Sequence, residues 1–318
     1  MSLHKLLKQT YTSNATCNIA LKVLDICDIQ LLTTKGIGRA NNNENNKKRE
    51  DILSKIFELP ETYMENPIYG DQWKSIHDKW KNAIQMINYF PYDRFEISQK
   101  GGRCYHYDFS AKYFKDDLVI DEKYIEFKHN CSRIDKLPQF LSLSTKCDFT
   151  DISYAEFYYD NYLPEYIKLD PILETNKPDK ETYIKYIYGT NYDAHPFFRM
   201  LYTREDYSKK DKHTIVNKSI EQYLTQFGCH ISLDRLTEKM LKSQANKYYM
   251  LWDLTNFHTD KFVEDDLILI ENEGIKNKNT IVLKSMTCQY HLLLRWRNHK
   301  GILLPAWQIS IKNRTPKI

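Results

Sequence analysis

The segment that most constrains the fold runs from Arg103 to Asn130, RCYHYDFSAKYFKDDLVIDEKYIEFKHN. Aromatic and β-branched residues alternate with polar residues in two parts of this segment, and a period of two predicts two strands. We expect one strand to end near Asp108 and the other to carry Tyr124 to Lys128. Successive side chains of a strand project to opposite faces. If the aromatic faces of the two strands point inward, Asp108, Glu126 and Lys128 converge on one polar patch.

Two carboxylates beside an ammonium group suit the hydrolysis of a phosphodiester bond. Mg²⁺ prefers oxygen ligands, commonly one or two carboxylates together with the phosphate oxygens of a substrate. The ammonium group can orient or help to deprotonate the attacking water, and it can stabilise the charge that develops on the phosphate. The three residues therefore predict a nuclease site with Mg²⁺ as its cofactor and Mn²⁺ as a substitute.

An aspartate followed by Glu-x-Lys on an adjacent strand resembles the motif of the PD-(D/E)XK nuclease superfamily, which includes the restriction endonucleases. The resemblance covers at most Lys47 to Ser144, and the chain has Tyr107 where a proline often precedes the aspartate of the family. It implies an α/β (α+β) fold in which helices flank a mixed central sheet. It also implies an endonuclease that acts on DNA, which is a commoner substrate in the family than RNA.

The resemblance also assigns roles to individual residues. Asp108 and Glu126 would bind the metal ion together with the backbone carbonyl of Phe127, and Lys128 would serve the nucleophilic water. The letters of the motif alone are weak evidence, because about six acidic-x-basic triplets are expected by chance in a chain with 42 acidic and 46 basic residues. The alternative interpretation of Glu126 and Lys128 is an exposed ion pair on a surface strand, worth under ~1 kcal/mol.

Context favours Glu126-Phe127-Lys128 over a second matching triplet. Asp121-Glu122-Lys123 follows Leu118-Val119-Ile120 and has the composition of a turn, whereas Glu126 and Lys128 are interleaved with apolar residues of a predicted strand.

A further carboxylate stands on the helix predicted from Lys47 to Leu59, which Pro60 ends. Glu50 lies on the apolar side of this helix, in line with Leu53 and Phe57. Superfamily members often place an acidic residue on the helix before the core strands, so Glu50 is our candidate for that position. The alternative is a first-turn glutamate that the helix dipole favours and water solvates.

Gln139 is a candidate for a supporting role. We expect a helix to begin in the segment from Pro138 to Thr145, with Gln139 in its first turn. In some exonuclease branches of the superfamily, a glutamine on the helix after the Glu-x-Lys strand supports the site. An exposed glutamine is the alternative.

The composition and periodicity of the rest of the chain predict further elements. A helix is expected from Asp71 to Ile87 with Asp71 as its cap, a first strand from Arg94 to Ser98, and a hairpin turn at Gly101-Gly102. The Asn-rich run from Asn41 to Asn46 has the composition of a polar loop. We therefore expect a nuclease core at residues 1–150, a helical segment at 151–246, and a β-rich basic region at 247–318 that completes the sheet or binds substrate.

The positive charge of the chain is concentrated near its end. The formal net charge is only +4, but residues 272–318 hold nine Lys or Arg and one acidic residue. Aromatic residues interleaved with Arg and Lys suit contact with nucleic acid, and core strands with solvated charges between them are the alternative. The rival function is accordingly a non-catalytic DNA- or RNA-binding protein that uses this region. The candidate nucleic-acid contacts are Lys35, Arg39 and Lys47 near the predicted loop, and Arg295, Arg297 and Lys300 near the end.

Cysteine usage and hydropathy predict an intracellular protein. Seven cysteines without a C-x-x-C pair argue against a disulfide framework and a zinc ribbon. No apolar run reaches the length of a membrane span, and the N-terminal segment lacks the apolar core of a signal peptide. We expect a cytoplasmic, reducing location, DNA as the partner, no membrane association, and a homodimer as one compatible assembly.

Overall fold

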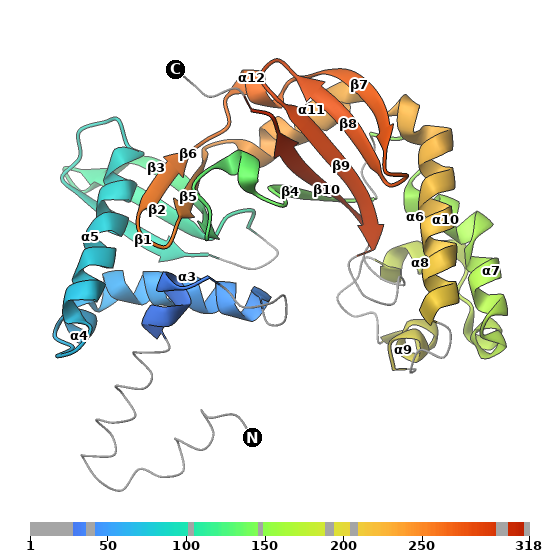
Figure 1. Cartoon of the computed structure of the whole chain (residues 1–318), viewed down its shortest axis with the longest axis horizontal. Helices are drawn as coiled ribbons and strands as arrows, with labels where there is room; N and C mark the ends of the chain where they lie inside the picture. The colour runs from blue at the N-terminus through green and yellow to red at the C-terminus, as the bar shows by residue number, and fades with distance from the viewer. Residues whose placement is uncertain are drawn as a thin grey trace, which may run out of the picture. The chain divides into compact units, whose positions relative to one another are not determined.

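The computed structural model describes residues 28–35, 42–100, 105–145, 149–187, 194–203, 209–296 and 305–314. The chain forms two compact units (Figure 1). The first unit contains Met1–Ile134 and Asn246–Lys261, and the second contains Asp135–Ala245 and Phe262–Ile318. These units do not coincide with the three expected segments, because residues 246–261 return to the first unit. The expected α/β (α+β) fold with a mixed sheet and a β-rich C-terminal region is confirmed.

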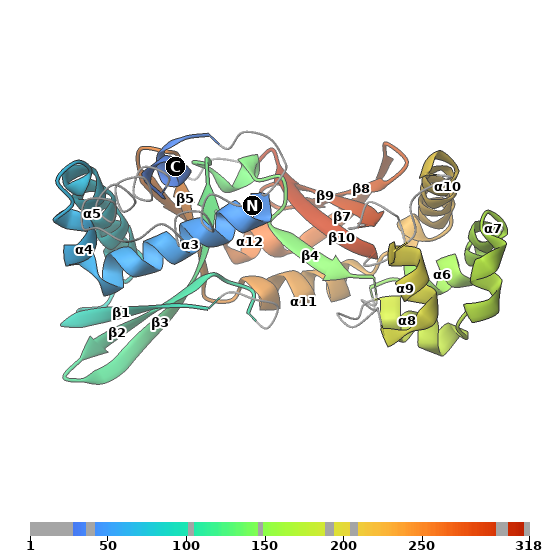
Figure 2. The same ribbon diagram turned by 90° about the horizontal axis from the view of Figure 1, so that it is seen from below.

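The first unit is built on a five-stranded sheet with the order β1-β2-β3-β5-β6. Its strands are β1 (Arg94–Gln99), β2 (Phe109–Lys115), β3 (Leu118–His129), β5 (Lys247–Trp252) and β6 (Phe257–Asp260). The first three strands follow one another as an antiparallel ribbon (Figure 2). Strand β5 pairs with β3 in parallel, so the long connection that such a pair requires is provided by residues 135–245 of the second unit.

Helices cover one face of this sheet. They are α3 (Asn42–Glu58), the short α4 (Pro60–Met64) and α5 (Gly70–Met86). The apolar stripe of α5, which includes Trp73 and Trp80, is fully buried against Ile125 and Phe127 of β3, as the helical and strand periodicities predict. Burying an apolar side chain of this size contributes about 1.5–3 kcal/mol. Glu126 and Lys128 consequently project from the opposite face of β3.

Two expectations about helix starts are wrong. Helix α3 already begins at Asn42, so the Asn-rich run is largely helical. Local side-chain contacts offset the low helix propensity of asparagine, since Arg49 Nη1 donates to Asn46 Oδ1 (2.8 Å) and Lys48 pairs with Glu44 one turn away. The N-cap of α5 is Tyr69, and Asp71 lies instead in the first turn, where the helix dipole favours a carboxylate.

Two expectations about the central strands are also wrong. Strand β2 begins at Phe109, so Asp108 precedes a strand and does not end one. The turn before β3 is formed by Asp116 and Asp117, whose φ angles of 49° and 60° match a two-residue hairpin turn. The segment Asp121-Glu122-Lys123 is therefore part of β3. The predicted strand Arg94–Ser98 is confirmed as β1, whereas Gly101-Gly102 lies outside the described residues.

The second unit combines helices with an antiparallel sheet of order β4-β10-β9-β8-β7. Its strands are β4 (Leu141–Ser144), β7 (Leu269–Lys276), β8 (Thr280–Ser285), β9 (Gln289–Trp296) and β10 (Pro305–Lys312). Its α-helices are α6 (Tyr154–Asn161), α7 (Leu163–Lys168), α8 (Lys180–Ile187), α9 (Pro196–Thr203), α10 (Lys209–Phe227), α11 (Leu233–Gln244) and α12 (Glu264–Leu267). A hairpin turn joins β7 to β8, with positive φ angles at Asn277 and Lys278.

The helix predicted in the segment from Pro138 to Thr145 is wrong. Leu141–Ser144 forms β4, which pairs with β10 in a register that places Leu141 opposite Ile309. Tertiary pairing with a strand far along the chain overrides the local pattern here. In the parts of the chain that the structure describes, no helix is both long and apolar enough to cross a lipid bilayer.

Candidate active site

Asp108 stands directly before β2 and faces β3. Its backbone N–H donates to the carbonyl of Ile125 (2.9 Å), and its carboxylate Oδ2 accepts a hydrogen bond from the N–H of Phe127 (2.8 Å). The β2–β3 pairing ends at Phe109 opposite Ile125, so Phe127 lies just past the last backbone pair. The side chain of Asp108 thus accepts the hydrogen bond from Phe127 that a neighbouring strand would otherwise accept. This bond holds Asp108 beside the Glu-x-Lys segment.

Glu126 and Lys128 lie beside each other on the outward face of β3. The ammonium group of Lys128 donates to Glu126 Oε1, and the two side chains keep 28% and 17% of their surface exposed, respectively. Burial lowers the pKa of Lys128, but the carboxylates of Glu126 and Asp108 outweigh burial and raise it overall. Lys128 is therefore a cation at neutral pH, able to donate hydrogen bonds to a water or a phosphate oxygen.

Lys247 completes this cluster, and sequence reasoning missed it. It opens β5, whose parallel register places it opposite Tyr124, and its Nζ lies 3.6 Å from Glu126 Oε2. Only 5% of its side chain is exposed, and burial lowers its pKa. A single lysine before the apolar run YYMLW gives no local sign of this role. Only knowledge that β5 is the neighbour of β3 could have revealed it.

Glu50 is a half-buried acid whose pKa is raised. Burial and then the charge of Asp108 raise the pKa of Glu50 to about 8, with Glu126 acting in the same direction and Lys128 against it. Because α3 begins at Asn42, Glu50 lies in the middle of the helix and not in its first turn, as the alternative required. Burial and the charge of Glu126 likewise raise the pKa of Asp108 to about 6. The structure thus brings Glu50 into the electrostatic field of the other three residues.

Gln139 does not stand where its expected role requires. It precedes strand β4 of the second unit, and the helical segment described between the Glu-x-Lys strand and β4 is a single 3-10 turn, Ile134–Lys136, which ends before Gln139. The structural reason for including Gln139 in the site is therefore removed.

The candidate nucleic-acid contacts are dispersed. Lys35 and Lys47 are exposed in the first unit, and Arg295 is exposed on β9 of the second, where its guanidinium donates to Gln308 (3.4 Å). Arg39, Arg297 and Lys300 lie outside the described residues. Trp296 and Trp307, which frame the basic segment, are buried: Trp296 Nε1 donates to Tyr154 and Trp307 packs near Tyr223. The aromatic residues of these two strands are therefore core, as the alternative interpretation predicts.

The donor set fits a metal ion that a substrate helps to hold. Within the described ranges, no group of three or more His, Cys, Asp or Glu side chains is arranged to bind a metal. Asp108 and Glu126 remain as two neighbouring carboxylates, and the Phe127 backbone lies beside Asp108. Mg²⁺ commonly binds through one or two carboxylates, water and substrate phosphates. A nearby divalent cation would also stabilise the ionised form of the crowded acids, whose pKa values are raised.

Comparison with known proteins gives no assignment. No family model, no curated protein and no solved structure matches the chain. Functional inference therefore depends on the residues of the site themselves.

Proposed function

We propose that the chain is a Mg²⁺-dependent nuclease that hydrolyses phosphodiester bonds of DNA, acting as a restriction-like endonuclease. The observation that best supports the proposal is that Asp108, Glu126 and Lys128 lie together just past the end of the β2–β3 pairing. There the side chain of Asp108 accepts a hydrogen bond from the backbone of β3. The carboxylates of Asp108 and Glu126 and the ammonium group of Lys128 therefore lie together at a partly exposed position. This combination suits a phosphate that is attacked by water.

The roles follow from the charges of the cluster. Asp108 and Glu126, with the carbonyl of Phe127, would hold Mg²⁺, which supplies positive charge against the charge that develops on the phosphate. Lys128 would hold the water or a phosphate oxygen through its N–H groups and would not take a proton, because its pKa is raised. Glu50, with a pKa raised to about 8, keeps its proton through the neutral range, so it is suited to donate a proton to the leaving oxygen.

Plasmid cleavage tests the proposal. Purified protein should nick or cut supercoiled DNA with Mg²⁺ and should not do so with EDTA. Asp108→Asn and Lys128→Ala should each lower the cleavage rate by at least about 100-fold. Both variants should bind DNA nearly as well as the parent.

The same strand offers matched controls. Lys123 pairs with Asp121 (2.8 Å) with side-chain exposures of 13% and 16%, yet the pair has no place in the proposed site. Lys123→Ala and Asp121→Asn should therefore leave cleavage within a few-fold of the parent. Strongly salt-dependent binding that is never followed by metal-dependent cleavage would instead favour the rival function, a non-catalytic nucleic-acid-binding protein.

A further inference from the structure

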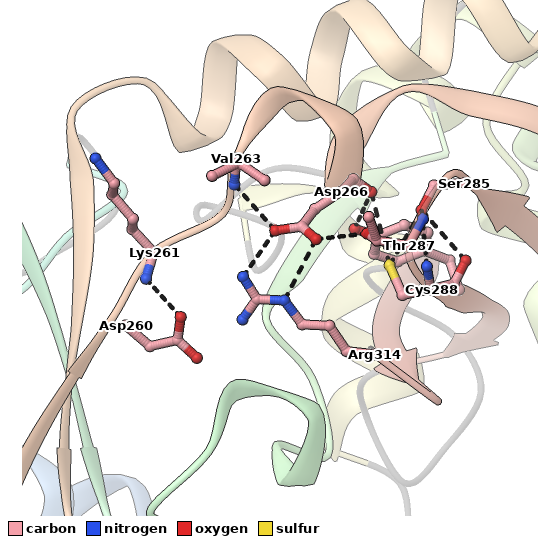
Figure 3. A network of polar contacts seen from close by, with 9 residues as sticks. Asp260, Lys261, Val263, Asp266, Ser285, Thr287, Cys288 and Arg314 are labelled. Atoms are coloured by element: carbon pink, nitrogen blue, oxygen red, sulfur yellow. Dashed lines mark hydrogen bonds and ion pairs between the residues drawn. The ribbon is translucent and has the colours of Figure 1, made fainter. Parts of the chain in front are cut away.

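The structure sorts the basic residues near the C-terminus into those that the second unit uses internally and those that it presents to solvent. The guanidinium of Arg314 is 8% exposed and donates to Asp266 Oδ2 (2.7 Å), as Figure 3 shows. Lys278 pairs with Glu221 of α10 (2.8 Å). Neither residue contributes an uncompensated charge. Four other cations remain among the described residues of this region, one on each of β7 to β10: Lys276, Lys284, Arg295 and Lys312.

These four cations share one face of the sheet. The other face is apolar and covered, since Trp296 and Trp307 pack against α6 and α10. Alternate residues of β9 and β10 are buried on that covered face, and the residues between them project oppositely. The strand register confirms the common face, because Lys312 and Lys284 both lie opposite Gln289 on either side of β9. We call the uncovered side the open face.

The remaining residues of the open face are mostly small or uncharged polar groups. They are Ser142, Ser144, Thr280, Gln289, His291, Gln308 and Ser310, together with Val282, Leu293 and Ala306. Its acids are Glu271 and Glu273, both on the edge strand β7. Glu271 lies 3.6 Å from Lys284, with both side chains about half exposed, and such a pair holds its partners weakly.

The positive field is concentrated at the centre of the open face. Burial, Lys276 and Lys312 all lower the pKa of His291, and Glu273 offsets them only in part. The two lysines therefore act on the same central residue although they stand on different strands. Glu273 offsets part of this field, because its Oε2 accepts a hydrogen bond from Gln289 Nε2 on the central strand β9 (2.6 Å).

We propose that the open face of the sheet β4-β10-β9-β8-β7 binds the sugar–phosphate backbone of duplex DNA. Neighbouring strands are about 4.8 Å apart and alternate residues about 6.8 Å apart, so the four strands present their cations as a grid roughly 15 Å wide. A duplex carries a phosphate every 3.4 Å along each strand, and Lys, Arg, Ser and Gln are typical phosphate and sugar contacts. Single-stranded DNA would instead call for exposed Phe, Tyr or Trp rings, and the described residues of the open face include none of these three.

The open face would give the proposed nuclease a binding site for its substrate outside the catalytic cluster. Its biological role therefore rests on the proposed function, whereas DNA binding itself does not require catalysis. Binding tests it without any cleavage. The parent for the experiment is the full chain carrying Lys128→Ala in EDTA, and the probe is a short fluorescent duplex titrated at a series of KCl concentrations.

The test variant removes three open-face charges: Lys276→Gln, Arg295→Gln and Lys312→Gln together. The matched control removes three charges from exposed helical positions of the same unit: Lys168→Gln, Lys185→Gln and Lys242→Gln. The test variant should bind the duplex more weakly, and the slope of log K against log salt should become shallower by about 2–3, because each lost phosphate contact removes about 0.9 from it. The control should keep the parental slope. Replacing Lys276 and Lys312 by Arg should also keep it.

Equal slopes for the test variant and the control, with unfolding midpoints that match, would overturn the inference. So would tighter binding of a single strand than of a duplex of the same length. Cleavage is measured separately with the chain that carries native Lys128. If DNA binds through the open face but is not cleaved in the presence of metal, the nuclease proposal is wrong and the binding proposal is retained. Cleavage that the open-face substitutions leave unchanged at every DNA and salt concentration refutes the face and leaves the nuclease standing.

Discussion

The Nζ of Lys247 lies 3.6 Å from Glu126 Oε2, while Lys128 donates to the other oxygen of the same carboxylate. Both oxygens of Glu126 therefore face an ammonium group. Asp108 has a different environment, because it is buried, receives one backbone N–H and lies beside the negative charge of Glu126. Such crowding of acidic and basic side chains is typical of functional sites.

The first prediction concerns the pH dependence of cleavage. Burial and the charge of Glu126 raise the pKa of Asp108 to about 6, and a protonated carboxyl group cannot bind Mg²⁺. The cleavage rate should therefore fall as the pH drops through about 6 and level off above it, until Glu50 loses its proton near pH 8. Higher Mg²⁺ concentration should move this acid limb to lower pH, because cation and proton compete for one carboxylate. A rate that is flat through this range would contradict the assignment of Asp108 as a ligand.

The second prediction assigns a positioning role to Lys247. Its charge lowers the pKa of Asp108, so Lys247→Met should raise that pKa and shift the acid limb of the pH profile upward. The plateau rate should fall about tenfold, since Glu126 loses one of its two partners. Lys123→Met on β3 is the control and should leave the limb in place. A lower plateau with an unmoved limb would indicate a purely structural role.

The sequence predicts most of the first unit because burial there follows local periodicity. Trp73 and Trp80 recur at helical spacing and Ile125 and Phe127 at strand spacing, and each lies in the core as expected. Glu50 is identifiable for the same reason, since it stands on the buried side of a regular helix. Alternation failed at residues 105–108, because Tyr107 leaves the strand pattern and stacks on Tyr124 (4.3 Å between ring centroids).

Non-local pairing set the limit of what the sequence could predict. Leu141–Ser144 becomes a strand because β10 binds it, and Lys247 reaches Glu126 because β5 returns to β3 after the whole helical segment. Neither partner is visible in the residues around these positions. Lys128 could therefore be assigned to the site from its spacing to Glu126 alone. Lys247 could be assigned only from the order of the strands in the sheet.

The third prediction concerns stability and Glu50. A raised pKa in the folded state means that the folded chain binds more protons than the unfolded chain between the ordinary value of about 4.3 and the folded value of about 8. The stability that Glu50 contributes is therefore present at acid pH and is lost as pH rises through this window. Glu50→Gln should make the protein more stable than the parent at alkaline pH by about 1–2 kcal/mol after solvent screening, and the gain should shrink toward pH 4. Urea unfolding at the two extremes of pH measures it.

The same substitution should lower cleavage, because the amide of Gln cannot transfer a proton as the carboxyl group of Glu50 does. A variant that is both more stable and less active would show that the half-buried acid is kept for function. Glu58, exposed near the end of the same helix, is the control, and Glu58→Gln should change the free energy of unfolding by at most about 0.5 kcal/mol. Equal behaviour of the two variants would contradict this prediction.

The fourth prediction concerns the buried network of Asp266 in the second unit (Figure 3). Asp266 accepts hydrogen bonds from Arg314 (2.7 Å), from Thr287 Oγ1 (2.5 Å) and from the N–H of Val263 (3.0 Å). Burial alone would raise the pKa of Asp266, but these donors outweigh it and lower the pKa. Arg314→Ala leaves a buried carboxylate without its cation, so it should reduce the free energy of unfolding by about 3–5 kcal/mol at neutral pH.

The exposed pair Lys278–Glu221 is the control for this measurement, and Lys278→Ala should cost at most about 1 kcal/mol. The sign of the pH effect follows from the lowered pKa: the contribution of Asp266 is complete above its unfolded value of about 3.9 and is lost as pH falls below it. The gap between Arg314→Ala and the parent should therefore be constant from neutral pH down to about 5 and should close only in stronger acid. Urea denaturation at several pH values measures the gap. A loss no larger than that of Lys278→Ala would show that the C-terminal residues are held by the sheet pairing of β10 and not by this ion pair.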